Sequence, residues 1–392
     1  VTMNNQKSDE KILQVKNLQT WFWTDAGIVK AVDGVSFDLH KREMLAIVGE
    51  SGSGKSVTNL AIMNLIPNPP GKIIGGEVWY NGKDVLKMDK QEIRQLRGNK
   101  ISMIFQDPMT SLNPFLKIST QMIETIRLHQ GLSKKDARDR AIEMLKLVGI
   151  PAAEKRVDCY PHQFSGGMRQ RVMIAMGLSC DPEVLIADEP TSALDVTIQA
   201  QILDLIGDLS ARLGTAVIMI THSLGLVAGM CDNVCVMYAG RVVEQGSVDE
   251  LFANPAHPYT RGLIKSVPRM DKKNTGRLFS ISGQPPNVID LPACCPFYPR
   301  CTEAMPQCKR EYPAVHQFSP THRASCWLYQ QGGGEGDARP AAASTAGSPA
   351  ASSTAQCQHS EMEQGSYTAA SDAAVSNESS QTAAGNTAGN NE

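Results

Sequence analysis

The stretch GESGSGKS, residues 49–56, limits the possible folds more than any other part of this 392-residue chain. It follows the short apolar run MLAIV, which predicts a buried strand, and it opens a segment expected to be helical. Glycines let consecutive backbone N–H groups point at phosphate oxygens, and the N-terminus of a helix attracts anions. The pattern G-x-x-x-x-G-K-[ST] in this setting therefore predicts a phosphate-binding loop.

Each residue of this loop has an expected role. The Lys55 ammonium should reach the β- and γ-phosphates of a nucleotide, and the Ser56 hydroxyl should be a ligand of Mg²⁺. The other residues expected to surround the phosphates are Gly49, Ser51, Gly52, Ser53, Gly54 and Val57.

The apolar run VLIAD and the glutamate that follows it supply a second part of the same site. Ligands of α/β proteins bind at the carboxyl ends of parallel strands, which is where Asp188 and Glu189 stand. Asp188 is expected to hold Mg²⁺ directly or through a water molecule, and Glu189 to act as the general base on the attacking water. The two motifs together predict a P-loop NTPase.

Short apolar runs recur along the chain and alternate with helical patterns. The runs at 101–105, 184–188, 216–221 and 233–238 indicate strands buried on both faces of a parallel sheet. Residues 11–48 alternate apolar and polar side chains, which predicts an antiparallel β layer. The fold class is therefore α/β. A helix is expected to begin at Ser133 and to place these side chains on one apolar face: Ala137, Ala141, Met144, Leu145 and Val148.

The string FSGGMRQR, residues 164–171, lies just before the acidic strand and resembles the signature motif of ATP-binding cassette (ABC) ATPases. Ser165 and the N–H groups after Gly166 and Gly167 are expected to begin a helix whose N-terminus faces the γ-phosphate held by a second subunit. Met168 replaces the usual glutamine, a variant expected to leave the signature active. The resemblance implies a RecA-like parallel core, an antiparallel β layer, a helical signature subdomain near 107–178, and two chains that enclose two ATP molecules.

Further residues match ABC motifs in chain order. The resemblance implies that Gln106 senses Mg²⁺ and water and touches the membrane subunit, that Asp195 lies in the loop crossing between the two ATPases, and that His222 contacts the γ-phosphate. Phe22 is expected to stack on adenine, with Trp23 as the alternative.

Several strings within about residues 11–330 resemble the ATPases of bacterial oligopeptide/dipeptide importers. They are GIVKAVDGVSFDL, FQDPMTSLNP, YPHQFSGGMRQRVMIAM and HPYT. The resemblance implies one ATPase of a heteromeric importer, whose partners are a second homologous ATPase, two membrane permeases and an extracytoplasmic peptide-binding protein. It also implies a peripheral location on the cytoplasmic face of the bacterial inner membrane. The alternatives are importers of nickel, glutathione or other small solutes, exporter ATPases, and soluble cassette ATPases.

Composition argues against several other classes. No run reaches the ~18 apolar residues that span a bilayer, and the N-terminal stretch VTMNNQKSDEK lacks the apolar centre of a signal peptide. The formal net charge is −2 and no basic block dominates, so a nucleic-acid partner is not expected.

Changes in composition divide the chain into regions. A flexible N-terminus at 1–10 is followed by the cassette at 11–255 and by a Pro- and Cys-rich domain at 256–330. The remainder, 331–392, has almost no large apolar side chains to offset the entropy of ordering, so it is expected to be a disordered low-complexity tail.

Cysteines gather in the 256–330 domain, although a reducing cytosol argues against disulfides there. Thiolates suit zinc or iron–sulfur clusters, but the C-x-x-C pairs of zinc ribbons are missing, and spacing alone leaves the chemistry open. The string C-x-F-x-x-R-C resembles a segment of some peptide-importer ATPases, which implies a structural 4Fe–4S cluster. Zinc and unligated thiols are the alternatives, and Cys294 is expected to be only a neighbour. The implied cluster ligands are Cys295, Cys301, Cys308 and Cys326.

Overall fold

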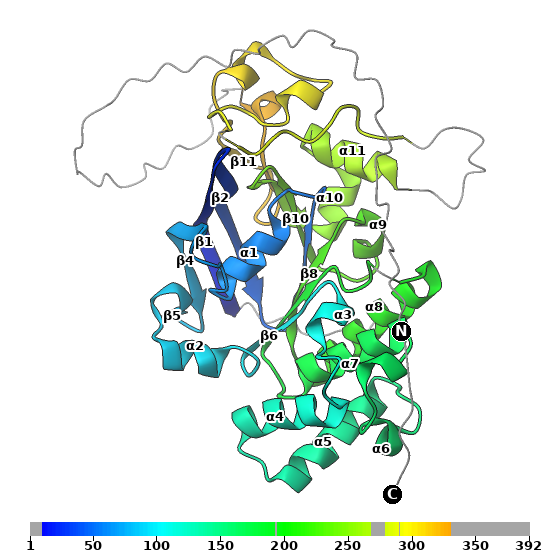
Figure 1. The fold of residues 1–392 in the computed structure, drawn as a ribbon. Helices are drawn as coiled ribbons and strands as arrows, with labels where there is room; N and C mark the ends of the chain where they lie inside the picture. The colour runs from blue at the N-terminus through cyan, green and yellow to red at the C-terminus, as the bar shows by residue number, and fades with distance from the viewer. Residues whose placement is uncertain (1–9, 193, 268–278, 290, 331–392) are drawn as a thin grey trace, which may run out of the picture. The chain divides into compact units, whose positions relative to one another are not determined.

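The computed structural model describes residues 10–192, 194–267, 279–289 and 291–330 (Figure 1). All of them fall within one compact unit of the chain, Val1–Cys357, whereas the other unit is Gln358–Glu392. The expected flexible N-terminus, apart from residue 10, and the expected disordered tail lie outside the described residues.

The larger sheet of the described residues has the strand order β11-β12-β10-β9-β3-β8-β7-β6, and its central part is parallel. The parallel strands are apolar runs that the fold buries on both faces, as the sequence predicts. They are β3 (Met44–Val48), β6 (Ile101–Ile104), β7 (Val184–Asp188), β8 (Ala216–Thr221) and β9 (Asn233–Tyr238). The antiparallel strands at one edge are β10 (Arg241–Ser247), β11 (Val315–Gln317) and β12 (Arg323–Ser325).

A second, antiparallel sheet has the order β2-β1-β4-β5 and comes mostly from the N-terminal part of the chain. Helix α1 (Lys55–Ile62) shares one apolar core with both sheets, and Figure 1 shows it beside them. The predicted antiparallel layer is therefore present. Its strands are β1 (Lys11–Thr24), β2 (Gly27–His40), β4 (Gly71–Tyr80) and β5 (Lys83–Asp84).

Most of the chain between β6 and β7 is helical, and these helices are grouped together in Figure 1. Ser133 precedes α5 and its Oγ accepts a hydrogen bond from the Asp136 N–H at 3.2 Å, which caps the helix as expected. Every side chain of the predicted apolar face is buried. The helices here are α3 (Pro108–Ser111), α4 (Ile118–Gln130), α5 (Lys134–Leu147), α6 (Ala153–Arg156) and α7 (Gly166–Leu178).

Further helices follow the strands β5, β7, β8 and β10 along the chain. None of the helices in the described ranges is long and apolar enough to cross a membrane. These further helices are α2 (Lys90–Leu96), α8 (Val196–Leu213), α9 (Leu224–Val227), α10 (Val248–Ala253) and α11 (Pro258–Ser266).

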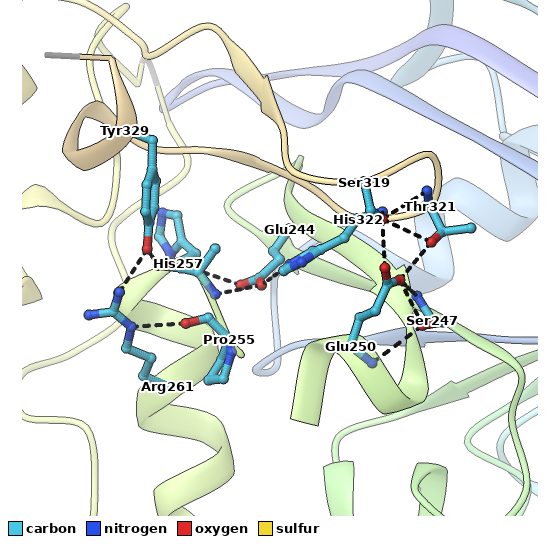
Figure 2. Close-up of polar contacts among 11 residues, drawn as sticks. Glu244, Ser247, Glu250, Pro255, His257, Arg261, Ser319, Thr321, His322 and Tyr329 are labelled. Carbon is cyan, nitrogen blue, oxygen red and sulfur yellow. Dashed lines mark hydrogen bonds and ion pairs between the residues drawn. The ribbon is translucent and has the colours of Figure 1, made fainter. Parts of the chain in front are cut away.

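Residues 256–330, called here the C-terminal region, return to the main sheet through the β11–β12 hairpin. Figure 2 shows the polar contacts that hold this return in place. The buried Glu244 carboxylate accepts the N–H groups of Ala256 and His257 at 2.7 and 2.8 Å, and it lies 2.8 Å from Nε2 of His322. Residues on both sides of position 255 therefore belong to one sheet.

Candidate active site

Residues that follow β3, β6, β7 and β8 meet around one cavity of about 660 Å³. Its walls contain loop residues 50–57 together with Gln106, Glu189 and His222. The cavity lies at the carboxyl ends of parallel strands, which is where α/β proteins bind ligands. The rest of its described lining is Val29, Ala31, Leu263 and Val288.

The loop between β3 and α1 needs glycine at its last position. Gly54 has φ +99°, a left-handed conformation that other residues rarely adopt, and a Cβ there would collide with the Ala31 carbonyl oxygen. This close approach lets the loop turn directly into α1, so that backbone N–H groups and the helix N-terminus face the cavity.

Lys55 folds back onto the loop that precedes it. Its Nζ donates to the Gly49 carbonyl at 2.8 Å and to the Glu50 carbonyl at 2.9 Å. Burial lowers the pKa of Lys55, and the carboxylates of Glu189, Asp188 and Glu50 oppose that change. The ammonium is thus held at the loop by oxygen atoms and lies near the acidic residues that end β7.

Ser56 and Asp188 come from distant parts of the chain and contact each other. The Ser56 hydroxyl donates to Asp188 Oδ1 at 3.1 Å. Asp188 is buried, and this burial raises its pKa. A hydroxyl and a carboxylate side by side offer the oxygen ligands that Mg²⁺ prefers.

Glu189 is the centre of a second polar group. Its Oε2 accepts from the amide nitrogen of Gln106 at 3.0 Å and lies 3.7 Å from Nδ1 of His222. Glu189 has φ +42°, which is unusual for a residue with a side chain, and its N–H donates to the Ile220 carbonyl at 3.1 Å. The backbone conformation therefore aims this carboxylate at the cavity.

The signature residues lie outside the described lining of this cavity. Ser165 caps α7, and its Oγ accepts from the Met168 N–H at 3.4 Å. Gly166 and Gly167 form the first turn of α7, as the sequence predicts. Asp195 is exposed at the N-terminus of α8. The chain on its own does not bring these residues to the phosphate loop.

The structure also leaves Phe22 away from the described cavity lining. Phe22 pairs with Val29 across β1 and β2, and its ring packs directly over Gly71. The alternative, Trp23, is exposed and lies beside Trp21, with ring centroids 6.5 Å apart. Val29, the cross-strand partner of Phe22, does line the cavity, so Phe22 lies on a strand next to it.

Two residues that contact the phosphate loop were not expected from the sequence. Arg300 makes an ion pair with Glu50, and the hydroxyl of Tyr259 accepts from the Glu50 N–H. Tyr259 lies in HPYT and Arg300 lies in C-x-F-x-x-R-C, two strings that resemble the importer branch. Neither string predicts a contact with Glu50, which lies 209 residues before Tyr259 and 250 residues before Arg300 in the chain.

The expected cluster cysteines lie near one another, since Cys301, Cys308 and Cys326 all act electrostatically on Cys295. The Cys295 N–H donates to the Cys308 carbonyl at 3.0 Å, so the segments are adjacent. Burial raises the pKa of the Cys295 thiol to about 12 and that of Cys326 to about 11. Within the described ranges no three His, Cys, Asp or Glu side chains are placed to hold a metal ion. The structure therefore gives no support of its own to the expected 4Fe–4S cluster at these residues and Cys301.

Comparison with known proteins defines the class of this chain. Residues 32–192 match the family described as ABC transporter, and residues 243–308 match the family described as Oligopeptide/dipeptide transporter, C-terminal region. Among solved structures, the dimeric post-hydrolysis state of the ATP-binding cassette MJ0796 bound to ADP and Pi is similar, with a TM-score of 0.54 and 28% identity. That likeness covers 60% of this chain and 98% of the other. The fold is that of an ABC transporter ATPase.

Curated relatives narrow the class further. The dipeptide transport ATP-binding protein DppD of Bacillus subtilis is 51% identical over 322 residues, 82% of this chain and 96% of the relative. The oligopeptide transport ATP-binding protein OppD of Escherichia coli is 49% identical over 322 residues, 82% of this chain and 94% of the relative. The chain belongs to the family of ATP-binding subunits of oligopeptide/dipeptide ABC transporters. The predictions of the fold, of an ATPase and of the importer branch are confirmed.

Proposed function

We propose that this subunit binds and hydrolyses ATP in the cavity around residues 50–57, and that hydrolysis drives the import of oligopeptides or dipeptides. One observation carries the proposal: Ser56 meets Asp188, and Gln106 and His222 meet Glu189, at a single phosphate loop. These side chains come from the ends of four strands, and their convergence is what phosphoryl transfer needs.

The loop binds the phosphates of ATP. Backbone N–H groups of residues 49–57 and the N-terminus of α1 face the anion, and Lys55 exchanges its carbonyl partners for phosphate oxygens. Ser56 and Asp188 would hold Mg²⁺, with Gln106 as a further ligand, and the ion would supply positive charge next to the phosphates. Phe22 is the residue proposed to stack on the adenine.

Glu189 is the proposed general base. A carboxylate at the end of β7 accepts a proton from water and so strengthens the nucleophile. Gln106 orients this carboxylate through the 3.0 Å contact, and His222, which is largely exposed here, turns to the γ-phosphate. The three residues act as one group, because Gln106 and His222 both contact the same Glu189 oxygen.

A second, homologous ATPase completes the site. Ser165, Gly166 and Gly167 form the N-terminus of the 13-residue helix α7, which favours an anion, yet they lie away from this chain's own loop. They are therefore proposed to face ATP bound to the partner, while Asp195 lies at the crossing between the two subunits. The similar MJ0796 cassette is itself dimeric.

Membrane permeases are the proposed mechanical partners. Large apolar side chains stand exposed next to Gln106, and Phe115 is the most exposed of them at 86%. Such a patch favours a protein partner. We place the subunit at the cytoplasmic face of the bacterial inner membrane, with an extracytoplasmic peptide-binding protein delivering substrate through the permeases. The exposed side chains are Phe105, Met109, Phe115 and Leu116.

The mechanism uses no iron–sulfur chemistry. Burial raises the pKa of the Cys295 and Cys326 thiols, and no step of ATP hydrolysis requires an electron. Zinc and iron measurement on the purified full chain tests whether the cysteines bind a metal.

Replacement of Glu189 by Gln tests the catalytic assignment. The amide cannot accept the proton from water, so we expect ATP turnover to fall by about 10²–10⁴-fold while MgATP binding persists. The matched control is Glu183→Gln, at the opposite end of β7, where the carboxylate contacts Lys100 and Asn81 instead of the cavity. Turnover of Glu189→Gln within a few-fold of the parent would reject the role of Glu189.

The transported solute requires its own measurement. In the assembled transporter with its binding protein, short peptides should stimulate ATP hydrolysis more strongly than Ni²⁺ or glutathione does. Stimulation by Ni²⁺ or glutathione alone would keep the ATPase assignment and replace the peptide assignment.

A further inference from the structure

The C-terminal region holds the phosphate loop through a bidentate ion pair. Arg300 Nη1 lies 2.6 Å from Glu50 Oε2, and Arg300 Nη2 lies 2.9 Å from Glu50 Oε1. The Arg300 side chain is only 5% exposed, so water screens this pair weakly. Paired N–H···O contacts of this kind fix the orientation of the carboxylate as well as its position.

A second contact from the same region reaches the backbone of the same residue. The Glu50 N–H donates to the Tyr259 hydroxyl at 2.9 Å, and the Tyr259 ring is fully buried. Glu50 is therefore held at its side chain by Arg300 and at its backbone by Tyr259. Both contacts come from beyond position 255, whereas the loop lies near position 50.

An aromatic cluster anchors the turn that carries Arg300. Phe297 is buried and lies with its ring centroid 5.2 Å from that of Tyr238 and 5.4 Å from that of Tyr259. Arg300 itself donates to the Tyr238 hydroxyl at 3.3 Å and to the Ser282 carbonyl at 3.1 Å. The guanidinium is thus positioned before any nucleotide arrives.

Glu50 passes this constraint on to the residues that bind phosphate. Its carbonyl accepts from Lys55 Nζ at 2.9 Å and from the Ser53 N–H at 3.2 Å. A shift of Glu50 would therefore displace the Lys55 ammonium and the loop N–H groups. Leu263 and Val288 also line the cavity, so the C-terminal region forms part of its wall.

A simpler explanation is that the ion pair only docks the C-terminal region onto the cassette. The Arg261–Glu303 pair, at 2.7 Å, joins two parts of the C-terminal region and does not touch the loop, so it offers a matched comparison. Figure 2 shows Arg261 with its further partners Tyr329 and Pro255. The two arginines therefore differ in whether their partner is a residue of the phosphate loop.

We propose that the C-terminal region sets the nucleotide affinity of this subunit, with Arg300 and Tyr259 as positioning residues that act through Glu50. The inference rests on the proposed role of residues 49–56 as the phosphate loop. It assigns to the segments HPYT and C-x-F-x-x-R-C a task in the ATPase site itself.

A double-mutant cycle on the full chain tests the proposal, with MgADP as the titrated ligand. Arg300→Gln and Glu50→Gln should each weaken binding about tenfold, the scale of a typical coupling between sites. The double variant should bind no more weakly than the weaker single variant, because both changes remove the same contact. The matched control, Arg261→Gln, should bind as the parent does.

Two conservative variants distinguish a loss of loop positioning from a general loss of folding. Tyr259→Phe keeps the buried ring and removes only the hydroxyl, and it should weaken MgADP binding several-fold. Arg300→Lys keeps the charge without the bidentate geometry, and it should restore part of the affinity lost in Arg300→Gln. In the transporter, Arg300→Gln should raise the KM for ATP while kcat at saturating ATP stays within about twofold.

Several results would overturn the inference: parental affinity in Arg300→Gln and Tyr259→Phe, an equal loss in Arg261→Gln, or additive losses in the double variant. The affinity of Lys55→Ala separates the two claims. If that variant bound MgADP as tightly as the parent, the proposed function would fail; if it lost binding and Arg300→Gln did not, only the inference would fail.

Discussion

His257 is a histidine that the fold keeps neutral. It is 2% exposed, and its Nδ1 accepts from the Tyr259 N–H at 3.1 Å, so the imidazole caps α11. Burial lowers its pKa to about 3, and the charge of Arg261 acts in the same direction. This uncharged ring supports the backbone of Tyr259, whose hydroxyl reaches the phosphate loop.

The neutral state of His257 predicts a loss of stability in mild acid. Its folded pKa lies below the unfolded value of about 6.5, so the unfolded chain binds the extra proton first as the pH falls. Between pH about 6.5 and about 3 this residue should reduce the free energy of unfolding by up to about 1.4 kcal/mol per pH unit. His257→Asn keeps a capping oxygen and cannot titrate, so its stability should fall less steeply than that of the parent. Denaturant titrations at pH 7 and pH 5 measure the free energy of unfolding. An equal loss of this free energy in the parent and in His257→Asn would contradict this account.

The β11–β12 hairpin is the element that joins the C-terminal region to the main sheet. It pairs with β10, and Glu244 of β10 fixes the segment where α11 begins. Glu250 of α10 accepts from the hydroxyls of Ser319 and Thr321, each at 2.6 Å, which holds the loop between the hairpin strands (Figure 2). Buried and partly buried carboxylates thus replace the extensive apolar face that so short a hairpin lacks.

The contacts of Glu244 allow a prediction of how much the junction between the main sheet and the C-terminal region contributes to stability. Glu244→Ala leaves two buried N–H groups and the His322 ring without their acceptor, and each unpaired buried donor costs about 1–3 kcal/mol. We therefore expect a loss of several kcal/mol in chemical denaturation. Glu143→Gln, whose carboxylate is 59% exposed in its pair with Arg140, should change stability by less than about 1 kcal/mol. Similar losses in the two variants would show that the Glu244 contacts contribute little.

At the scale of the whole molecule, the cassette and the C-terminal region share both a sheet and an apolar cluster. The cluster contains Tyr238 from β9, Tyr259 from α11 and Phe297 from the cysteine-bearing segment. A chain that ended near position 255 would expose the edge of β10 and open this cluster.

Two truncations test this shared structure. A chain of residues 1–255 should aggregate, because an exposed strand edge and buried aromatic side chains would face water. A chain of residues 1–330 should stay soluble and bind MgADP as the full chain does, since it keeps every contact described above. Solubility and nucleotide affinity check both outcomes, and a soluble, nucleotide-binding 1–255 chain would contradict the argument.

Local patterns were enough to predict the parts of this protein that depend on neighbouring residues. GESGSGKS, VLIADE and the capped helix at Ser133 predict strand, loop and helix, because backbone geometry and apolar periodicity act over a few residues. The resemblance to ABC motifs, taken in chain order, also predicted which polar residues meet at the cavity, since the carboxyl ends of parallel strands share one edge.

What the sequence determined by itself is the class of site: a phosphate loop, two acidic residues after a buried strand, and the motifs around them. Only the tertiary structure decided that Phe22 and the signature residues lie outside the described lining of this chain's own cavity, and that Arg300 binds Glu50. The physical reason is that long-range contacts depend on how the sheets and the C-terminal region pack. The spacing of residues along the sequence does not specify that packing.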